Sequence, residues 1–79
     1  MALTFKLFSQ PGCAPCGVLE RKLQEAGVSF EKINIRDDFS VVEKHGLRST
    51  PTLIAFDGEQ EVRRIQGDVS KQELQVFLS

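Results

Sequence analysis

The sequence predicts an α/β domain of the order β-α-β-α-β-β-α, with a mixed four-stranded sheet and helices on both faces. Two observations support this fold class. Strand-like and helix-like segments alternate along the first part of the chain, as in folds that place helices against a sheet. Near the C-terminus, Asp57-Gly58 is a hairpin signal between two strand-like segments. The length of 79 residues fits one domain over residues 1–79, with a core that is modest but sufficient without staples or metals.

The first half of the chain contains two predicted strands with a helix between them. Leu3–Ser9 is rich in β-formers and apolar on both faces, which indicates a central strand. Val28–Ile35 predicts the second strand, and Gly27 is suited to ending the helix before it. The apolar residues of that helix recur at helical spacing: Cys16, Leu19, Leu23 and Ala26.

The second half begins with a short helix that Asp37 or Asp38 can cap and that ends at Gly46. Pro51–Phe56 predicts a third strand that is fully covered, because it is apolar almost throughout. Glu59–Gln66 alternates well enough for a half-exposed edge strand. We expect both strands of this hairpin to run antiparallel to the first strand.

The last predicted helix has a clear N-terminal signature. Ser70 and Glu73 form a capping box, and Val69 can pack against Leu74 as a hydrophobic staple. We expect three apolar residues of this helix to face the core: Leu74, Phe77 and Leu78.

Composition argues against several classes of protein. Ten basic and eleven acidic residues nearly cancel, so the chain has no basic footprint for nucleic acid. No apolar run approaches the roughly 18 residues that a membrane span needs. The opening MALTFKLFSQ has no basic region followed by an apolar segment, so we expect no signal peptide and a cytoplasmic location. We also expect a monomer.

Cys13 and Cys16 stand close together in SQPGCAPCGVLERKL and allow three interpretations: a structural staple, a metal clamp or a redox pair. A bridge between them closes a very short loop and adds little folding stability. A closed zinc site needs about four ligands. The chain has one histidine, His45, and no second ligand pair at a suitable spacing, so we expect no metal. A cluster shared between two chains is the remaining metal alternative.

The redox interpretation agrees with the chemistry of the position. Cys13 stands at the predicted N-terminus of a helix, where backbone N–H groups and the helix dipole favour a thiolate. Pro15 lies in the first turn, where its missing N–H costs nothing. A pKa that falls from about 8.5 to about 7 raises the thiolate fraction at neutral pH from a few per cent to about half. We expect Cys16, one turn inside the helix, to be the buried resolving thiol.

Over nearly all of its length, the chain resembles a small member of the thioredoxin/glutaredoxin superfamily. The first mark is CAPC at Cys13–Cys16, after the first strand. The second is RSTPTLIAF at Arg48–Phe56, which resembles the superfamily's cis-proline segment. The third is QGDVSKQELQVFL at Gln66–Leu78, which resembles the glycine and capped last helix of thioredoxins. The resemblance implies a minimal thioredoxin-like fold with a cis Thr50–Pro51 bond.

The resemblance also implies a substrate-binding surface. In that fold Pro51 lies against the cysteines, and the backbone of Thr50 is free to pair with an extended segment of the substrate. Ser49 and Arg48 are expected to border the same surface. Arg48 either biases the choice of partner by its charge or is an ordinary solvated loop residue.

The residues that separate the branches of the superfamily give a mixed result. The inner pair Ala-Pro is closer to the Gly-Pro of thioredoxins than to the Pro-Tyr of glutaredoxins, although the length is that of a glutaredoxin. Gln10 stands where glutaredoxins carry a glutathione-binding lysine. Ser49-Thr50-Pro51 and Gly67-Asp68 stand where they carry Thr-Val-Pro and Gly-Asp. Leu7 stands where thioredoxins carry a buried aspartate, so no proton acceptor for Cys16 is identified.

Taken together, the resemblance implies a dithiol–disulfide oxidoreductase that reduces partner proteins through Cys13 and Cys16. No bound cofactor is expected beyond the redox-active disulfide itself. A flavoenzyme of the thioredoxin reductase type or glutathione would supply electrons. Ribonucleotide reductase is a candidate substrate, because its glutaredoxin-like hydrogen donors are of similar length. The alternatives are a glutathione-dependent glutaredoxin and a redoxin-fold binding module without turnover.

Overall fold

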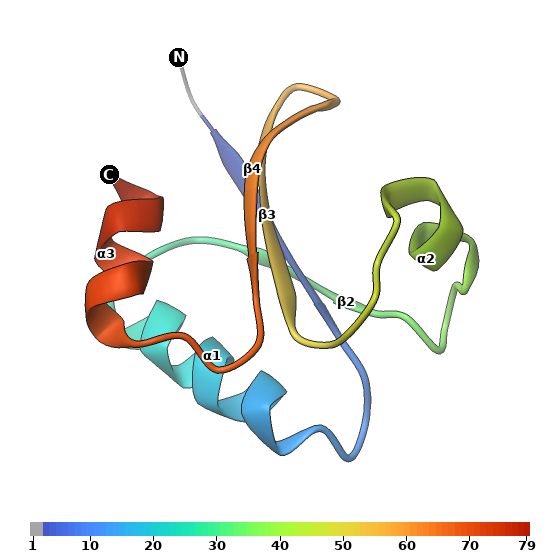
Figure 1. Ribbon diagram of the computed structural model, residues 1–79, viewed down its shortest axis with the longest axis horizontal. Coiled ribbons are helices and arrows are strands. Elements are labelled where there is room, and N and C mark those ends of the chain that lie inside the picture. The colour runs from blue at the N-terminus through green and yellow to red at the C-terminus, as the bar shows by residue number, and fades with distance from the viewer. Residues whose placement is uncertain (1–2) are drawn as a thin grey trace.

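The computed structural model describes residues 3–79, and its elements follow the predicted order β-α-β-α-β-β-α. Figure 1 shows how these elements are arranged. Their bounds are β1 (Thr4–Ser9), α1 (Ala14–Glu25), β2 (Glu31–Asn34), α2 (Ser40–His45), β3 (Thr52–Asp57), β4 (Gln60–Gln66) and α3 (Lys71–Leu78).

The strands form one mixed sheet in the order β2-β1-β3-β4. β1 pairs with β2 in parallel, with Phe8 opposite Ile33, and with β3 antiparallel, with Leu7 opposite Leu53. The central position predicted for the first strand is confirmed. β3 is also central, and Thr52–Phe56 is buried, which confirms the prediction of a fully covered strand.

The predicted direction of the last strand is wrong. β3 runs antiparallel to β1, as expected, but β4 is antiparallel to β3. The chain therefore reverses twice, and β4 runs in the same direction as β1. A hairpin always places its two strands in opposite directions, so both could not oppose β1.

Two predicted boundaries also differ from the structure. β2 begins at Glu31, not Val28, because pairing with β1 starts at Glu31, while Val28 and Phe30 pack against the core. The N-cap of α2 is Phe39, whose side chain makes no cap hydrogen bond. Asp38 instead accepts a hydrogen bond from the Ser40 N–H at 3.1 Å, so it holds the turn just before the helix.

Helices cover both faces of the sheet, as predicted, and each face has its own core. On one face α1 and α3 pack against the sheet, and on the other α2 does, as the two sides of Figure 1 show. The first core contains Leu7, Leu19, Leu23, Leu53, Ala55, Val69, Leu74 and Phe77. The second contains Phe8, Ile54 and Phe56, with Ile33, Ile35, Val41 and Leu47 packed against it.

The ends of the two longer helices follow the sequence signals. The capping box of α3 is present, because the Ser70 hydroxyl accepts from the Glu73 N–H at 3.1 Å and the Glu73 carboxylate accepts from the Ser70 N–H. α1 is followed by Gly27 at a φ of +71°, a left-handed conformation that suits glycine. Three of the predicted core residues of α1 are buried, whereas Ala26, just beyond the helix, is exposed.

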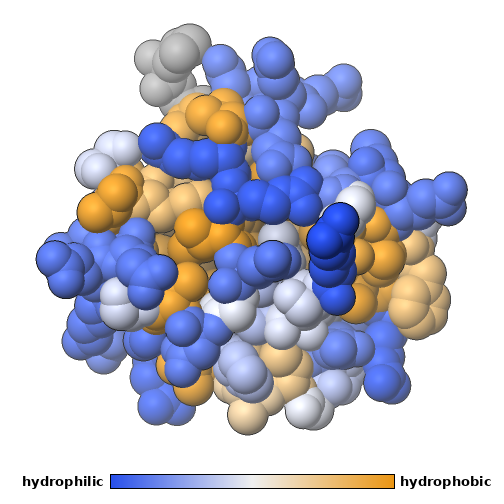
Figure 2. Space-filling view, viewed as in Figure 1, coloured by the Kyte–Doolittle hydropathy of each residue, from blue (hydrophilic) through white to orange (hydrophobic). Residues whose placement is uncertain are grey.

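The surface carries scattered apolar groups. Figure 2 shows hydrophobic patches interrupted by hydrophilic side chains over the face that it views. The large apolar residues that are exposed come from different elements: Val18, Phe39, Val62 and Val76. Within residues 3–79, none of the helices has the length and apolar character that crossing a membrane requires.

Candidate active site

The two cysteines lie at the start of α1 and form a disulfide, with their Cα atoms 5.3 Å apart. Cys13 is the N-cap of the helix and is half-buried, whereas Cys16 is only 5% exposed. An incoming molecule therefore reaches Cys13 more easily. This difference in exposure agrees with the predicted roles of attacking and resolving thiol.

The local sequence explains this placement. β1 ends at Ser9, and Gly12 turns the chain with a φ of +78°, a value that favours glycine. Cys13 then takes an extended conformation and Pro15 occupies the first helical turn. The Cys16 N–H donates a hydrogen bond to Cys13 Sγ at 3.2 Å. This donor stabilises negative charge on Cys13 once the disulfide is reduced.

The loop before β3 meets the disulfide. The Thr50–Pro51 peptide bond is cis, as the resemblance of this segment to the superfamily's cis-proline segment implied, and Pro51 is buried. The Thr50 hydroxyl donates to Cys13 Sγ at an oxygen–sulfur distance of 3.6 Å. Within residues 3–79 the backbone N–H and C=O of Thr50 have no backbone hydrogen-bond partner. The loop thus brings the Thr50 hydroxyl to Cys13 Sγ, while the backbone N–H and C=O of Thr50 remain available for hydrogen bonds to another molecule.

Four of the residues predicted to bind substrate border one hollow beside this loop. They are Gln10, Arg48, Ser49 and Thr50, and the apolar walls come from Ile35, Val42 and Leu47. Gln10 Nε2 donates to Thr50 Oγ1 at 3.0 Å, and the Ser49 hydroxyl donates to Gln66 Oε1 at 3.4 Å. Arg48 is exposed at the rim. The hollow is therefore lined by both apolar and polar residues.

The other two predicted binding residues, Gly67 and Asp68, are not among the lining residues of this hollow. The Gly67 N–H donates to the Pro51 carbonyl at 2.9 Å, which fixes the end of β4 against the cis-proline loop. Asp68 is turned toward α1, where its carboxylate meets Lys22 Nζ at 3.3 Å. The structure thus brings Gly67 to the loop and gives Asp68 a partner on the helix.

Sequence reasoning missed two residues near Cys16. A second hollow is lined by both cysteines and by Glu20 and Lys32, whose side chains form an ion pair at 3.2 Å. Glu20 follows Cys16 by four positions in α1 and so lies on the same helix face. That spacing was a usable signal. Lys32 comes from β2, and its approach depends on the pairing of β2 with β1.

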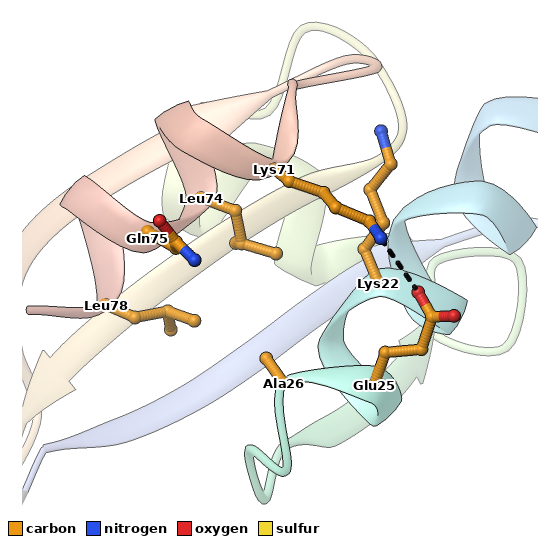
Figure 3. Close-up of a pocket in the computed structure, with 7 residues that line it drawn as sticks. All are labelled: Lys22, Glu25, Ala26, Lys71, Leu74, Gln75 and Leu78. Atoms are coloured by element: carbon orange, nitrogen blue, oxygen red, sulfur yellow. Dashed lines mark ion pairs between the residues drawn. The ribbon is translucent and has the colours of Figure 1, made fainter.

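The described part of the chain contains no group of three or more His, Cys, Asp and Glu side chains arranged to hold a metal. A further hollow lies between α1 and α3, lined by Ala26, Leu74 and Leu78, with the Lys71–Glu25 ion pair at its edge (Figure 3). None of its lining residues belongs to the cysteine segment or the cis-proline loop. It is therefore separate from the site at Cys13.

Comparison with known proteins shows where this arrangement belongs. The model of the thioredoxin family matches residues 5–79, which include the cysteine pair, the cis-proline loop and the last helix. The chain belongs to the thioredoxin family. Membership in the wider thioredoxin/glutaredoxin superfamily and the minimal thioredoxin fold, both expected from the sequence, are confirmed.

Individual thioredoxins show the same relationship. The chain is 33% identical over 70 residues to thioredoxin 1 of Nostoc sp. (strain PCC 7120), with 81% of this chain and 65% of the relative covered. It is 40% identical over 67 residues to the thioredoxin of Chlamydia caviae, with 78% and 66% covered. The chain thus spans about two thirds of the length of these thioredoxins.

Among solved structures, the crystal structure of Trxlp from Edwardsiella tarda matches with a TM-score of 0.86 and 25% identity. The match covers 99% of this chain and 82% of that one. A thioredoxin mutant from Halobacterium salinarum matches with a TM-score of 0.83 at 22% identity, which shows the common fold.

Proposed function

We propose that the chain is a thiol–disulfide oxidoreductase that reduces disulfides in partner proteins. The observation that carries this proposal is the position of Cys13. It is a helix N-cap, it is accessible, and it is bonded to a buried Cys16 beside the cis-proline loop. Thioredoxin-family membership supports the same activity.

In the proposed reaction, the reduced protein carries Cys13 as a thiolate and Cys16 as a thiol. The Cys13 sulfur attacks one sulfur of the substrate disulfide, and the other substrate sulfur leaves as a thiolate that takes a proton from water. Cys16 then loses its proton and attacks Cys13 Sγ, which releases the second substrate thiolate. Two electrons pass to the substrate, and the Cys13–Cys16 disulfide of the present structure is formed.

We propose that the substrate binds across the cis-proline loop. The open backbone N–H and C=O of Thr50 can pair with an extended segment of the partner, as in a short strand addition. The neighbouring hollow would take an apolar side chain of the same segment, with Arg48 and Ser49 at its rim. Gly67 supports this surface through the hydrogen bond from its N–H to the Pro51 carbonyl.

The same residues bear on the choice of electron donor. Gln10 offers an uncharged amide where a glutathione carboxylate would need a cation, so we propose a flavoenzyme of the thioredoxin reductase type as the main donor. Asp68 is already paired with Lys22. Glutathione is the competing donor, and ribonucleotide reductase is one candidate substrate in a reducing cytoplasm.

A two-donor assay tests this proposal. Reduction of the disulfides of insulin is followed in parallel with NADPH and thioredoxin reductase, and with glutathione and glutathione reductase. We expect turnover with both and a faster rate with the flavoenzyme. A protein that binds partners but turns over with neither donor would be a binding module, and its cysteines would titrate as ordinary thiols near a pKa of about 8.5.

A further inference from the structure

The side chains of Gln10, Thr50 and Cys13 form a chain of two hydrogen bonds that the steps above do not use. Gln10 Nε2 donates to Thr50 Oγ1 at 3.0 Å, and Thr50 Oγ1 donates to Cys13 Sγ at 3.6 Å. The two bonds join residues 40 and 37 positions apart in sequence. We infer that Thr50 is a catalytic residue whose hydroxyl stabilises the Cys13 thiolate, and that Gln10 is the positioning residue that orients this hydroxyl.

We call these two hydrogen bonds, from Gln10 to Thr50 and from Thr50 to Cys13, the relay. The number of protons on the Thr50 hydroxyl supports the direction of both bonds. A threonine hydroxyl has one proton to donate and lone pairs to accept. Because an amide N–H of Gln10 occupies a lone pair of the oxygen, the single hydroxyl proton remains available for the sulfur. A residue at position 10 without a side-chain N–H would not orient the Thr50 hydroxyl, whose proton could then point away from the sulfur.

The relay stabilises the reduced protein because the charge on Cys13 Sγ differs between the disulfide and the thiolate. In the disulfide, Cys13 Sγ is neutral and a weak acceptor. In the reduced protein it carries a negative charge, and hydrogen bonds to charged acceptors are roughly twice as strong as neutral ones. The Thr50 hydroxyl therefore stabilises the thiolate more than the disulfide, in addition to the Cys16 N–H, which donates to the same sulfur.

Two consequences follow, and both rest on the proposed function of Cys13 as the attacking thiol. The relay lowers the pKa of Cys13, so more thiolate is present at neutral pH. It also favours the reduced state over the disulfide, which makes the protein a stronger oxidant than it would be without the hydroxyl.

Four variants test the relay: Thr50→Val, Thr50→Ser, Gln10→Met and the double variant Thr50→Val/Gln10→Met. The pKa of Cys13 is measured in each reduced protein from the pH dependence of iodoacetamide alkylation, with mass spectrometry to locate the modified cysteine. Valine keeps the branched shape of threonine but has no hydroxyl, and serine keeps the hydroxyl. Methionine removes the amide donor without adding charge.

We expect Thr50→Val to raise the pKa of Cys13 by about one unit, which is a tenfold loss of thiolate below that pKa. Thr50→Ser should stay close to the wild type. Gln10→Met should raise the pKa by a smaller amount in the wild-type background and by nothing further in the Thr50→Val background. The equilibrium constant for reduction of Thr50→Val against a reference dithiol should fall about tenfold, equivalent to about 30 mV.

An unchanged pKa in Thr50→Val overturns the role of the hydroxyl, as does an equal rise in Thr50→Ser. An additive effect of Gln10→Met in the double variant overturns the role of Gln10. If Thr50→Val does not fold, Thr50→Ala replaces it, and Gln10→Met alone still tests the relay. These outcomes leave insulin reduction by the wild type untouched, so a failed relay is distinguishable from a failed function.

Discussion

Lys22, on α1, donates a hydrogen bond from Nζ to the backbone carbonyl of Val69 at 2.7 Å. Val69 lies between β4 and α3 and is 6% exposed, so the bond joins the first helix to the segment that leads into the last one. The same ammonium group meets the Asp68 carboxylate at 3.3 Å. The Lys22 side chain thus fixes the segment between β4 and α3 to α1.

Replacing Lys22 by Met should destabilise the protein by about 1–2 kcal/mol, because a hydrogen bond from a charged donor is lost. Chemical denaturation measures the change. Asp68→Asn is the matched control: the Asp68 side chain is 63% exposed, and pairs of this kind contribute at most about 1 kcal/mol. Equal losses in the two variants would show that the ion pair, and not the bond to Val69, carries the effect.

The capping box of α3 gives a second prediction. Ser70→Ala removes the acceptor for the Glu73 N–H and should cost about 1 kcal/mol of folding free energy. The midpoint of urea unfolding should fall with an unchanged slope. Ser29→Ala, at an exposed serine outside the helices, is the control and should change the midpoint little. A midpoint for Ser70→Ala that matches this control would show that the cap does not stabilise the protein.

His45 should make stability depend on pH. Its ring packs against Phe8 and Phe56, at centroid distances of 5.2 and 5.5 Å. Burial lowers its pKa, the charges of Lys44 and Lys6 lower it further, and Glu61 opposes them with a smaller effect. The folded protein therefore keeps His45 neutral to a lower pH than the unfolded chain, whose imidazole titrates near about 6.5.

The sign of this effect follows from proton binding. Below a pH of about 6.5 the unfolded chain binds a proton at His45 that the folded state resists, so stability falls as the pH falls. His45→Phe keeps a ring in the same place and removes the titration. Denaturation at pH 7.5 and 5.5 should show a larger loss for the wild type than for the variant. Equal losses would contradict the prediction.

The residue at position 10 should determine how fast glutathione reduces the protein relative to the flavoenzyme. Gln10→Lys supplies a cation beside the hollow at Thr50 and should raise the glutathione-driven rate severalfold, because a charge-assisted contact to a carboxylate becomes available. Gln24→Lys adds the same charge on an exposed part of α1 and should leave that rate unchanged. A wild type that runs on glutathione as fast as on the flavoenzyme would place the protein functionally with the glutaredoxins.

Local patterns predicted most of the architecture. The spacing of Cys16, Leu19 and Leu23 predicts the buried face of α1, and all three are buried. The capping box at Ser70 is equally local and is present. The start of β2 depends on where its pairing with β1 begins. Apolar composition does not contain the start of this pairing, so the start of β2 was predicted incorrectly. The direction of β4 already follows from the hairpin at Asp57-Gly58, because the two strands of a hairpin run in opposite directions, and the prediction did not apply this rule.

In the site, too, features within one short segment were predictable from the sequence, and contacts between distant segments were not. The cysteine pair and the cis-proline segment were visible as short motifs, and the structure brings them together. The contact of the Thr50 hydroxyl with Cys13, and the support that Gln10 gives it, depend on a loop that closes on the helix start. No spacing rule predicts such a contact between residues 37 positions apart.

The most direct test of the roles of Cys13 and Cys16 is to trap the reaction intermediate. Reduced Cys16→Ser and Cys13→Ser are each mixed with a disulfide-containing protein, and the covalent adduct is measured by intact mass under non-reducing conditions. Because the resolving attack is missing, Cys16→Ser should accumulate a stable mixed disulfide through Cys13, whereas Cys13→Ser should trap almost none. Adducts of equal yield, or adducts only with Cys13→Ser, would contradict the assignment of Cys13 as the attacking thiol.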